Sequence, residues 1–465
     1  QSGAASRPAG RGPALMGEYL QPLLMVLALI LGIFTGYPVA FVLAGIGIVF
    51  ALATGIPIQF LGSVVFRIFS GVVANWLLLA VPLFVFMGLM LEKAGTAEAL
   101  LLSLERMFAR TPGGLAISVA VLGIVMAAST GIIGASVVLL GVLALPVMLR
   151  QRYDKQLALG IIAASGTLGI LIPPSIMLIL VGDILGLSVG DLFMAALIPG
   201  LLLGLVYIGY ILLVAIIMPH KAPVAAPEEG GPEGTALLLE LFRDLLAPVL
   251  LIVGVLGSIL AGIATPTEAA AIGALGTLIL AALSGRLRFV TLSETVYETG
   301  KTTAMIIFVA IGATCFSAVF KRLGGDYMIE DAVTAFAFGP YGTLALLMII
   351  IFILGFFLEW IEISYVVLPL FAPIVSDLDF GLGLSSEQLL IWFAILVAIN
   401  LQTSFLTPPF GYALFYLKGI APEGVSMGNI YRSITPFVLL QLLGLLLAIA
   451  FPSIVLWLPM ALGGR

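Results

Sequence analysis

Long apolar segments follow one another through almost the whole chain and constrain its fold more than any other feature. Each approaches or exceeds the roughly 17–25 residues that span a hydrocarbon core. Only 9% of the 465 residues are charged, whereas soluble domains carry roughly 25%, so a soluble fold of this composition would expose apolar surface almost everywhere. One signal peptide cannot explain a pattern that runs from end to end. The sequence therefore predicts an all-α polytopic membrane protein. The segments include Leu20–Phe34, Leu77–Leu91, Leu201–Met218, Leu245–Ile263, Leu344–Leu358 and Ile434–Leu458.

Few residues are suited to redox or metal chemistry. The single cysteine, Cys315, excludes an intrachain disulfide and is interpreted as a small apolar residue. The single histidine, His220, ends an apolar run and is interpreted as a solvated helix end, because a zinc site needs three or four converging ligands. No basic stretch indicates nucleic-acid binding. We therefore expect no transition metal and no nucleic-acid partner.

Two segments differ in composition from the apolar remainder. Residues 1–15 are small, polar and rich in Pro and Gly, which is typical of a linker, a fusion junction or a tag remnant. Residues 219–240 form the only long polar stretch inside the chain. The expected organisation is a first membrane repeat over residues 16–218, a polar connecting segment over residues 219–240 and a second membrane repeat over residues 241–465.

Proline and glycine landmarks recur in the same order in the two halves. The sequence from Pro38 matches that from Pro266, and the sequence around Pro112 matches that around Pro340 at the same offset. Any one match can arise by chance among apolar sequences, but several in the same order predict an internal repeat. Further pairs are Pro146 with Pro373 and Pro173-Pro174 with Pro408-Pro409, the latter at a slightly longer offset.

The charges beside the two repeats favour opposite orientations in the membrane. Three basic residues lie in residues 150–155, whereas the corresponding residues 376–387 are acidic and contain no Lys or Arg. Because Lys and Arg concentrate in cytoplasmic loops, this contrast predicts inverted-topology repeats. Lys93 and the Lys321-Arg322 pair are basic in both halves and favour the alternative, parallel repeats.

One segment in each half interrupts the apolar pattern with small polar residues followed by two prolines. Residues 165–175 read Ser-Gly-Thr-Leu-Gly-Ile-Leu-Ile-Pro-Pro-Ser, and residues 400–411 read Asn-Leu-Gln-Thr-Ser-Phe-Leu-Thr-Pro-Pro-Phe-Gly. Proline cannot continue a helix, so each pair predicts a broken helix whose second half starts at Pro173 or Pro408. Such backbone must line a cavity or be buried in protein, and paired breaks are typical of transporter binding sites. The alternative is two proline kinks in ordinary packed helices.

The two halves of each broken helix offer opposite partial charges. The half that starts at the break favours an anion, and the half that ends there offers carbonyls to a hard cation such as Na⁺. The residues expected to bind the anionic substrate are Pro173, Pro174, Ser175, Thr407, Pro408, Pro409 and Gly411. The polar residues that would add cation ligands are Ser165, Thr167, Asn400, Gln402, Thr403 and Ser404.

A second pair of segments, ahead of the breaks, predicts two re-entrant helical hairpins. The flanking apolar stretches are too short for two full spans each, so the tips are expected within residues 129–136 and 355–364. The second tip contains Glu359 and Glu362, and acidic groups inside apolar segments are costly and typical of functional sites. They would balance a bound cation or set the conformation of the tip. Alternatively, they lie just outside the hydrocarbon, where charge costs little.

The residues from Ala264 to Ala271, Ala-Thr-Pro-Thr-Glu-Ala-Ala-Ala, resemble the signature of the large membrane (DctM-like) subunit of tripartite ATP-independent periplasmic (TRAP) transporters. The segment from Gly355 and the Pro-Pro breaks resemble the same family, and the similarity covers about residues 17–460. It implies inverted repeats, a scaffold and a mobile transport domain of the elevator type. It also implies Na⁺-coupled import of a small organic anion, such as a carboxylate, across the bacterial inner membrane, without a cofactor. The implied partners are a small four-helix (DctQ-like) membrane subunit and a periplasmic (DctP-like) solute-binding protein.

The resemblance also implies a distribution of site residues. Glu362 is added to the expected substrate site, and many relatives have an aspartate where this chain has Glu359. Glu268 lies in the most recognisable motif, with a role that is either functional or structural. The Na⁺ positions implied are Ser129, Thr130, Gly134, Ser136, Ser165, Gly166, Thr167 and Gly169, and their counterparts Glu359, Ser364, Asn400, Gln402, Thr403 and Ser404.

Three other functions compete with this one. The nearest is a Na⁺- or H⁺-coupled anion transporter of related inverted-repeat fold that works without a binding protein. An intramembrane enzyme is disfavoured because the chain has no His-Glu-x-x-His motif and one histidine for acid–base work. A channel would be indicated by ion flux far above carrier rates.

Overall fold

The structure, a computed structural model, covers most of the chain. The predicted linker, residues 1–15, and residues 225–234 of the predicted connecting segment lie outside the described residues. The described residues between 19 and 462 form helices and turns and no β-strand, which confirms the all-α prediction. The described ranges are residues 19–131, 133–224, 235–335 and 338–462, without the side chains of residues 128–130, 235–244 and 334.

Seven helices within these ranges are long and apolar enough to cross a membrane. Their length and composition confirm the prediction of a polytopic membrane protein. The seven are Trp76–Lys93, Ile133–Arg150, Val189–Ile217, Pro266–Leu283, Phe289–Arg322, Ser386–Leu406 and Met427–Ala450.

The chain forms two compact units, and each draws on both halves of the sequence. Among the described residues, the smaller unit combines those from 19 to 74 with those from 307 to 343, and the larger combines those from 75 to 306 with those from 344 to 462. The helix breaks and the predicted hairpin tips all belong to the larger unit. The predicted repeat boundaries are a different division of the chain and stay a prediction.

In the smaller unit, α1 packs on α2, and a small apolar cluster forms around Val64, Cys315 and Ala318. Cys315 is 6% exposed, which confirms its interpretation as a small apolar residue. The elements of this unit are α1 (Leu20–Ile33), α2 (Val39–Ala53), α3 (Ile58–Ile68), the π-helical turn η1 (Phe69–Val73), α14 (Gly325–Ala335) and the later part of α13 (Phe289–Arg322).

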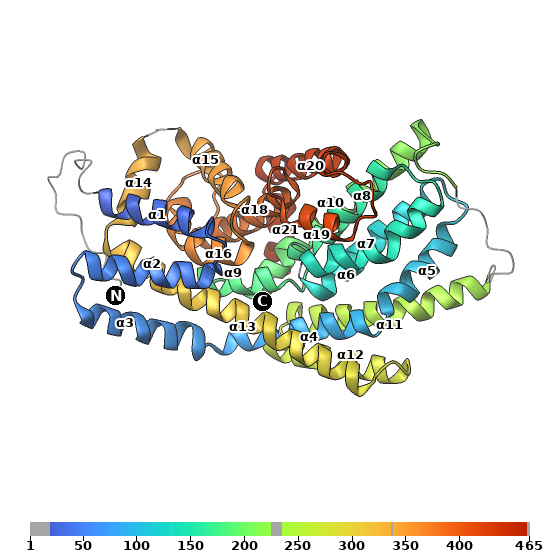
Figure 1. Ribbon diagram of the computed structural model, residues 1–465, viewed down its shortest axis with the longest axis horizontal. Coiled ribbons are helices and arrows are strands. Elements are labelled where there is room, and N and C mark those ends of the chain that lie inside the picture. Colours follow the sequence, from blue (N-terminus) through green and yellow to red (C-terminus); the bar gives the residue numbers. More distant parts are fainter. Residues whose placement is uncertain (1–18, 132, 225–234, 336–337, 463–465) are drawn as a thin grey trace. The chain divides into compact units, whose positions relative to one another are not determined.

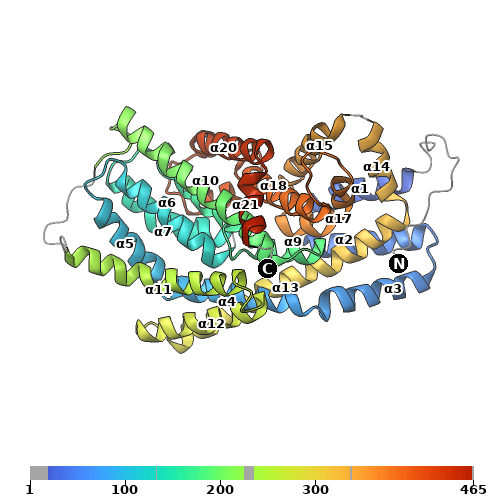
Figure 2. The same cartoon turned by 180° about the vertical axis from the view of Figure 1, so that it is seen from behind.

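The larger unit is built around α8, on which α6, α7 and α20 pack (Figure 1). α10 packs against α20 and α21 (Figure 2). The elements of this unit before the connecting segment are η2 (Trp76–Leu79), α4 (Ala80–Lys93), α5 (Thr96–Phe108), α6 (Gly114–Thr130), α7 (Ile133–Arg150), α8 (Lys155–Thr167), η3 (Leu168–Ile170), α9 (Ile176–Leu185) and α10 (Val189–Ile217). Those after it are α11 (Thr235–Leu260), α12 (Pro266–Leu283), α15 (Gly339–Leu354), α16 (Trp360–Val366), α17 (Leu368–Ser376), α18 (Ser386–Leu406), α19 (Tyr412–Ile420), α20 (Met427–Ala450) and α21 (Ser453–Leu462).

The order of elements repeats along the chain. α6 and α7 pack on each other beside one tip, and α15 is followed along the chain by α16 and α17 after another tip; we call these segments hairpin 1 and hairpin 2. A longer helix then ends at a break and a short helix follows, as α8 and α9 in one half and α18 and α19 in the other. Each set closes with a long helix, α10 or α20. The Pro-Pro landmarks therefore mark equivalent points of one repeated plan.

The start of α12 is fixed by a capping box. The Thr265 hydroxyl accepts from the backbone N–H of Glu268 at 3.3 Å, and Glu268 Oε2 accepts from the backbone N–H of Thr265 at 2.8 Å. Two backbone donors that lack helical partners are thereby satisfied. The most recognisable motif of the sequence thus has a structural role at a helix N-terminus.

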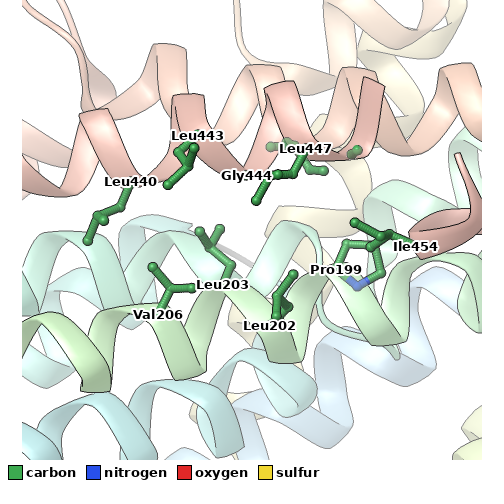
Figure 3. Close-up of a pocket in the computed structure, with 11 residues that line it drawn as sticks. Pro199, Leu202, Leu203, Val206, Leu440, Leu443, Gly444, Leu447 and Ile454 are labelled. Atoms are coloured by element: carbon green, nitrogen blue, oxygen red, sulfur yellow. The ribbon is translucent and has the colours of Figure 1, made fainter. Parts of the chain in front are cut away.

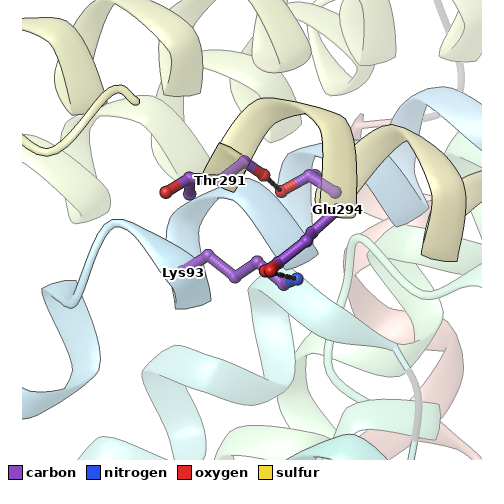
Figure 4. Close-up of polar contacts among 4 residues, drawn as sticks. Lys93, Thr291 and Glu294 are labelled. Atoms are coloured by element: carbon purple, nitrogen blue, oxygen red, sulfur yellow. Dashed lines mark hydrogen bonds and ion pairs between the residues drawn. The ribbon is translucent and has the colours of Figure 1, made fainter. Parts of the chain in front are cut away.

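The end of α4 is held by two basic side chains. Lys93 Nζ lies 2.9 Å from Glu294 Oε2 of α13 (Figure 4). Arg286 donates from Nη1 to the carbonyl oxygen of Ala94 at 3.1 Å, one of the carbonyls left free at a helix end. These bonds fix α4 against the segment that links α12 to α13.

Candidate functional site

Both predicted helix breaks are present, but the second half of each helix starts later than predicted. α9 starts at Ile176 and α19 at Tyr412, so the predicted starts at Pro173 and Pro408 are wrong. The residue before a proline is pushed out of the helical region, so a Pro-Pro pair lengthens the non-helical link instead of opening the next helix. Both Pro-Pro bonds are cis.

The first break packs on hairpin 1 through residues that the sequence analysis singled out. A Cβ on Gly166 would lie 2.5 Å from a Val137 methyl group of α7, and Gly123 of α6 allows the close approach of Ser165. A Cβ on Gly169 would lie 3.7 Å from Cα of Gly131 at the tip. Ser165, Gly166 and Gly169 are therefore brought together against one hairpin.

The tip of hairpin 1 contacts both short half-helices. A Cβ on Gly131 would lie 3.3 Å from the backbone nitrogen of Ile176, the first residue of α9. A Cβ on Gly134 would lie 2.7 Å from the ring of Tyr416 on α19. Ser136 is buried beside them, whereas the side chains of Ser129 and Thr130 lie outside the described residues.

The second break is tied to hairpin 2 by two hydrogen bonds. Asn400 donates from Nδ2 to the carbonyl oxygen of Met348 at 2.7 Å, and Ser404 donates to that of Phe352 at 2.7 Å. The two side chains are four residues apart on α18 and share one face. Gly355 permits this contact, because a Cβ there would lie 2.5 Å from Ser404 Oγ.

The hydroxyl groups of four other predicted site residues donate to nearby carbonyl oxygens of their own segments. Thr403 donates to Ile399 and Thr407 to Thr403 on α18, at 2.9 and 2.7 Å. Ser364 donates to Trp360, and Ser175 to Ile170, at 2.7 and 2.8 Å. Their oxygens keep lone pairs for a ligand, but their hydrogens are already used.

The two acids of hairpin 2 have different positions. Glu359 is the N-cap residue of α16 but makes no side-chain cap hydrogen bond. Glu362 is 5% exposed, and its Oε2 has no hydrogen-bond partner among the described residues. The Tyr412 hydroxyl of α19 lies 3.4 Å from the carbonyl oxygen of Phe357, so the tip of hairpin 2 lies against the half-helix that follows the second break.

The structure adds two residues that the sequence analysis missed. Tyr207 of α10 and Gln441 of α20 are fully buried, and Gln441 Nε2 lies 2.7 Å from the Tyr207 hydroxyl. The same Nε2 lies 3.5 Å from Oγ1 of Thr167, and Gln402 Nε2 lies 3.4 Å from that oxygen. We call Thr167, Tyr207, Gln402 and Gln441 the polar hub. A buried glutamine in an apolar helix was the available signal.

An aliphatic groove lies beside the polar hub, between α10 and α20. Figure 3 shows Leu440, Leu443 and Leu447 of α20 facing Leu202 and Leu203 of α10. The groove offers no charged or hydrogen-bonding side chain, so it does not suit a small organic anion. It flanks the hub with apolar side chains.

No group of three or more His, Cys, Asp or Glu side chains gathers as a metal site would require, within the residues that the structure describes.

The model of the family described as "Tripartite ATP-independent periplasmic transporter, DctM component" matches residues 25–454. The chain belongs to this family. This DctM-family chain is therefore a permease subunit in the bacterial inner membrane and not an enzyme, and these predictions are confirmed.

Several relatives match most of the DctM-family chain. It is 32% identical over 390 residues to a C4-dicarboxylate TRAP transporter large permease protein of Pseudomonas aeruginosa, covering 84% of this chain and 87% of the relative. It is 31% identical to an ectoine/5-hydroxyectoine large permease protein of Ruegeria pomeroyi, covering 82% and 85%. A sialic acid large permease protein of Vibrio cholerae is 29% identical, with 92% and 96% covered.

The fold of the DctM-family chain is also found in a solved transporter structure. The YdaH transporter of Alcanivorax borkumensis superposes with a TM-score of 0.60 at 16% identity, covering 93% of this chain and 98% of the other. This likeness concerns the fold alone.

Proposed function

We propose that the chain carries a small organic anion, such as a carboxylate, into the cell together with Na⁺. The observation that supports this most directly is the pair of helix breaks, each packed on its own hairpin, in a chain of the DctM family. Two broken helices at matching positions are typical of a carrier's binding site. The relatives named for C4-dicarboxylate, sialic acid and ectoine agree with a small, polar organic substrate.

The chemistry at the breaks supports both ligands. The N-caps of α9 and α19, Ser175 and Gly411, make no side-chain cap hydrogen bond, so the first N–H groups of both half-helices suit an anion. The ends of α8 and α18 offer carbonyl and hydroxyl oxygens, which a hard cation such as Na⁺ prefers. Ser165 Oγ is buried and has no hydrogen-bond partner among the described residues, so it is a free oxygen ligand beside hairpin 1.

We further propose that the two repeats have opposite orientations and that transport uses an elevator movement of the breaks and hairpins. The basic residues 150–155 and the acidic residues 376–387 support the inversion. The proposed partners are a small four-helix membrane subunit and a periplasmic solute-binding protein that delivers the anion. The competing function is a carrier of the same fold that needs no binding protein.

Uptake into proteoliposomes tests this proposal. Labelled C4-dicarboxylate, sialic acid and ectoine would be offered with and without Na⁺, and with and without the small subunit and the binding protein. We expect uptake of one of them to require Na⁺ and both partners. Uptake that needs no binding protein would contradict the proposed partners, and uptake indifferent to Na⁺ would contradict the coupling.

Two substitutions locate the cation ligands within the breaks. Ser165→Ala and Asn400→Ala are expected to raise the Na⁺ concentration for half-maximal uptake by about tenfold, the effect of losing ~1.4 kcal/mol. Ser433→Ala on α20 is the control, because its buried hydroxyl bonds only within its own helix, to Ile430 at 2.6 Å. If both variants keep the wild-type Na⁺ dependence, these two residues do not belong to the site.

A further inference from the structure

The hydroxyl oxygen of Thr167 has three polar contacts in the polar hub. Its hydroxyl donates its one hydrogen to the carbonyl oxygen of Ala164 at 2.8 Å. A hydroxyl oxygen has two lone pairs, and here they face Nε2 of Gln402 at 3.4 Å and Nε2 of Gln441 at 3.5 Å. Both lone pairs of Thr167 are therefore approached by amide donors, at the outer limit of hydrogen-bond distance, while both amides stay in place.

A cation at the first break must move one of these amides. Coordination needs one lone pair of Thr167, and an amide N–H that points at the same oxygen would be repelled by the positive charge. Gln402 lies on α18, the helix of the second break. A cation that displaces the Gln402 amide from Thr167 at the first break would therefore also move a side chain of the second broken helix.

The glutamines of the hub have an alternative arrangement available. Oε1 of Gln402 and Oε1 of Gln441 are buried and have no hydrogen-bond partner among the described residues. An unpaired carboxamide oxygen in an apolar interior is costly. Rotation of either amide by half a turn would bring that oxygen toward the hydroxyl groups or a cation. Such a rotation would give the hub a second hydrogen-bond arrangement, and an element that couples two sites requires two.

The hub draws equivalent residues from the two repeats. Gln402 follows Thr167 at the same offset that relates the two Pro-Pro pairs, and Gln441 follows Tyr207 at nearly the same offset. All four side chains are 0% exposed. The hub is therefore closed to bulk solvent in this arrangement, and the adjoining groove is aliphatic.

We propose that Tyr207 and Gln441 are positioning residues that couple the two helix breaks through Thr167 and Gln402, so that cation binding at one break changes affinity at the other. The inference rests on the proposed Na⁺ coupling. Tyr207 holds the Gln441 amide at 2.7 Å, and Gln441 in turn occupies Thr167. Neither positioning residue needs to touch the cation or the substrate.

Binding of radiolabelled Na⁺ to the permease with its small subunit tests this coupling. We expect the wild type to bind with a Hill coefficient of about 2, and Gln441→Leu to reduce it to about 1, because the two sites then bind independently. Tyr207→Phe should give a smaller reduction, because Gln441 keeps its contact with Thr167. Ser433→Ala on the same helix should leave the steepness unchanged. A Hill coefficient for Na⁺ binding that stays at the wild-type value in Gln441→Leu would overturn the inference.

A second measurement separates this inference from the proposed function. Hydrogen–deuterium exchange of peptides spanning residues 165–175 and 400–411 needs no Na⁺. Gln441→Leu is expected to speed exchange in both peptides by at least about threefold, while Ser433→Ala leaves both unchanged. A wild type that binds no Na⁺ contradicts the proposed function alone. Unaltered exchange in both peptides of Gln441→Leu overturns the hub as a link between the breaks.

Discussion

The two helix breaks share a backbone plan but differ in their side chains. At the offset that separates the two Pro-Pro pairs, Asn400 and Ser404 on α18 correspond to Ser165 and Gly169 on the first broken helix. Asn400 and Ser404 both donate across to α15, whereas Ser165 Oγ has no partner among the described residues and Gly169 has no side chain. The comparison indicates that hydrogen bonds join the second break to its hairpin, whereas close packing of glycines joins the first break to its own.

The hairpin tips differ in the same sense. At the offset that relates Pro38 to Pro266, Gly131 and Gly134 correspond to Glu359 and Glu362. Gly134 admits the ring of Tyr416, while Glu362 places a buried carboxyl group in the first turn of α16. The repeat thus fixes where a chain segment turns, and the side chains at each turn supply different chemistry.

The largest effect is expected where hairpin 1 leaves no room for a side chain. Gly134→Val would push the tip away from Tyr416, and overpacking of this kind costs about 1–3 kcal/mol. We expect transport in proteoliposomes to fall by about tenfold or more. Gly209→Val on α10 is the matched control, because a Cβ there meets nothing within 4 Å. Full transport by Gly134→Val would contradict the close contact at this tip.

A smaller effect is expected where hairpin 2 is hydrogen-bonded. Ser404→Ala leaves the carbonyl oxygen of Phe352 without this donor, so the free energy of unfolding should fall by about 1–3 kcal/mol in a denaturant titration. Thr403→Ala should cost less, because its hydroxyl bonds to the carbonyl of Ile399 in its own helix.

The first repeat supplies the counterpart of this experiment. Gly169→Ala should change the free energy of unfolding by no more than about 0.5 kcal/mol, because the new Cβ would meet its neighbours at 3.6 Å or beyond. Equal losses in Ser404→Ala and Gly169→Ala would mean that the two breaks are held in the same way.

The smallest effect is expected at the start of α12. Glu268→Ala removes half of the capping box and should lower the free energy of unfolding only slightly, because the carboxylate is exposed to solvent, with transport retained. The equivalent helix of the first repeat, α2, follows Pro38 and has no side-chain cap, so it offers no such loss. Glu298→Ala, an exposed acid 3.8 Å from Lys301, is the control. Lost transport in Glu268→Ala at unchanged stability would restore a direct functional role.

The sequence was sufficient to predict the helical class, the repeat and the positions of both breaks, because proline and charge act locally on the backbone and on membrane insertion. It placed the starts of α9 and α19 too early, because a Pro-Pro pair keeps the residues before it out of the helical region and so extends the non-helical link. The ties from Asn400 and Ser404 to α15 were not predicted, because they depend on which face of α18 meets the hairpin.

Tyr207 and Gln441 were missed for a related reason. Each is a single polar residue in a long apolar helix, and a helix pattern alone does not reveal that two such residues meet. Their separation along the chain, close to the repeat offset, was the signal that could have paired them. A search for polar residues at the repeat offset would have found the polar hub.

The capping box of α12 has a consequence for how permeases of this kind diversify. Within the stretch that makes the chain recognisable, Thr265 and Glu268 are exposed and bond to each other. The bonds that these two residues make begin a helix. The family motif and the proposed substrate site therefore lie in different parts of the polypeptide. A permease can then acquire a new solute by changes at its breaks and tips while its family motif stays intact.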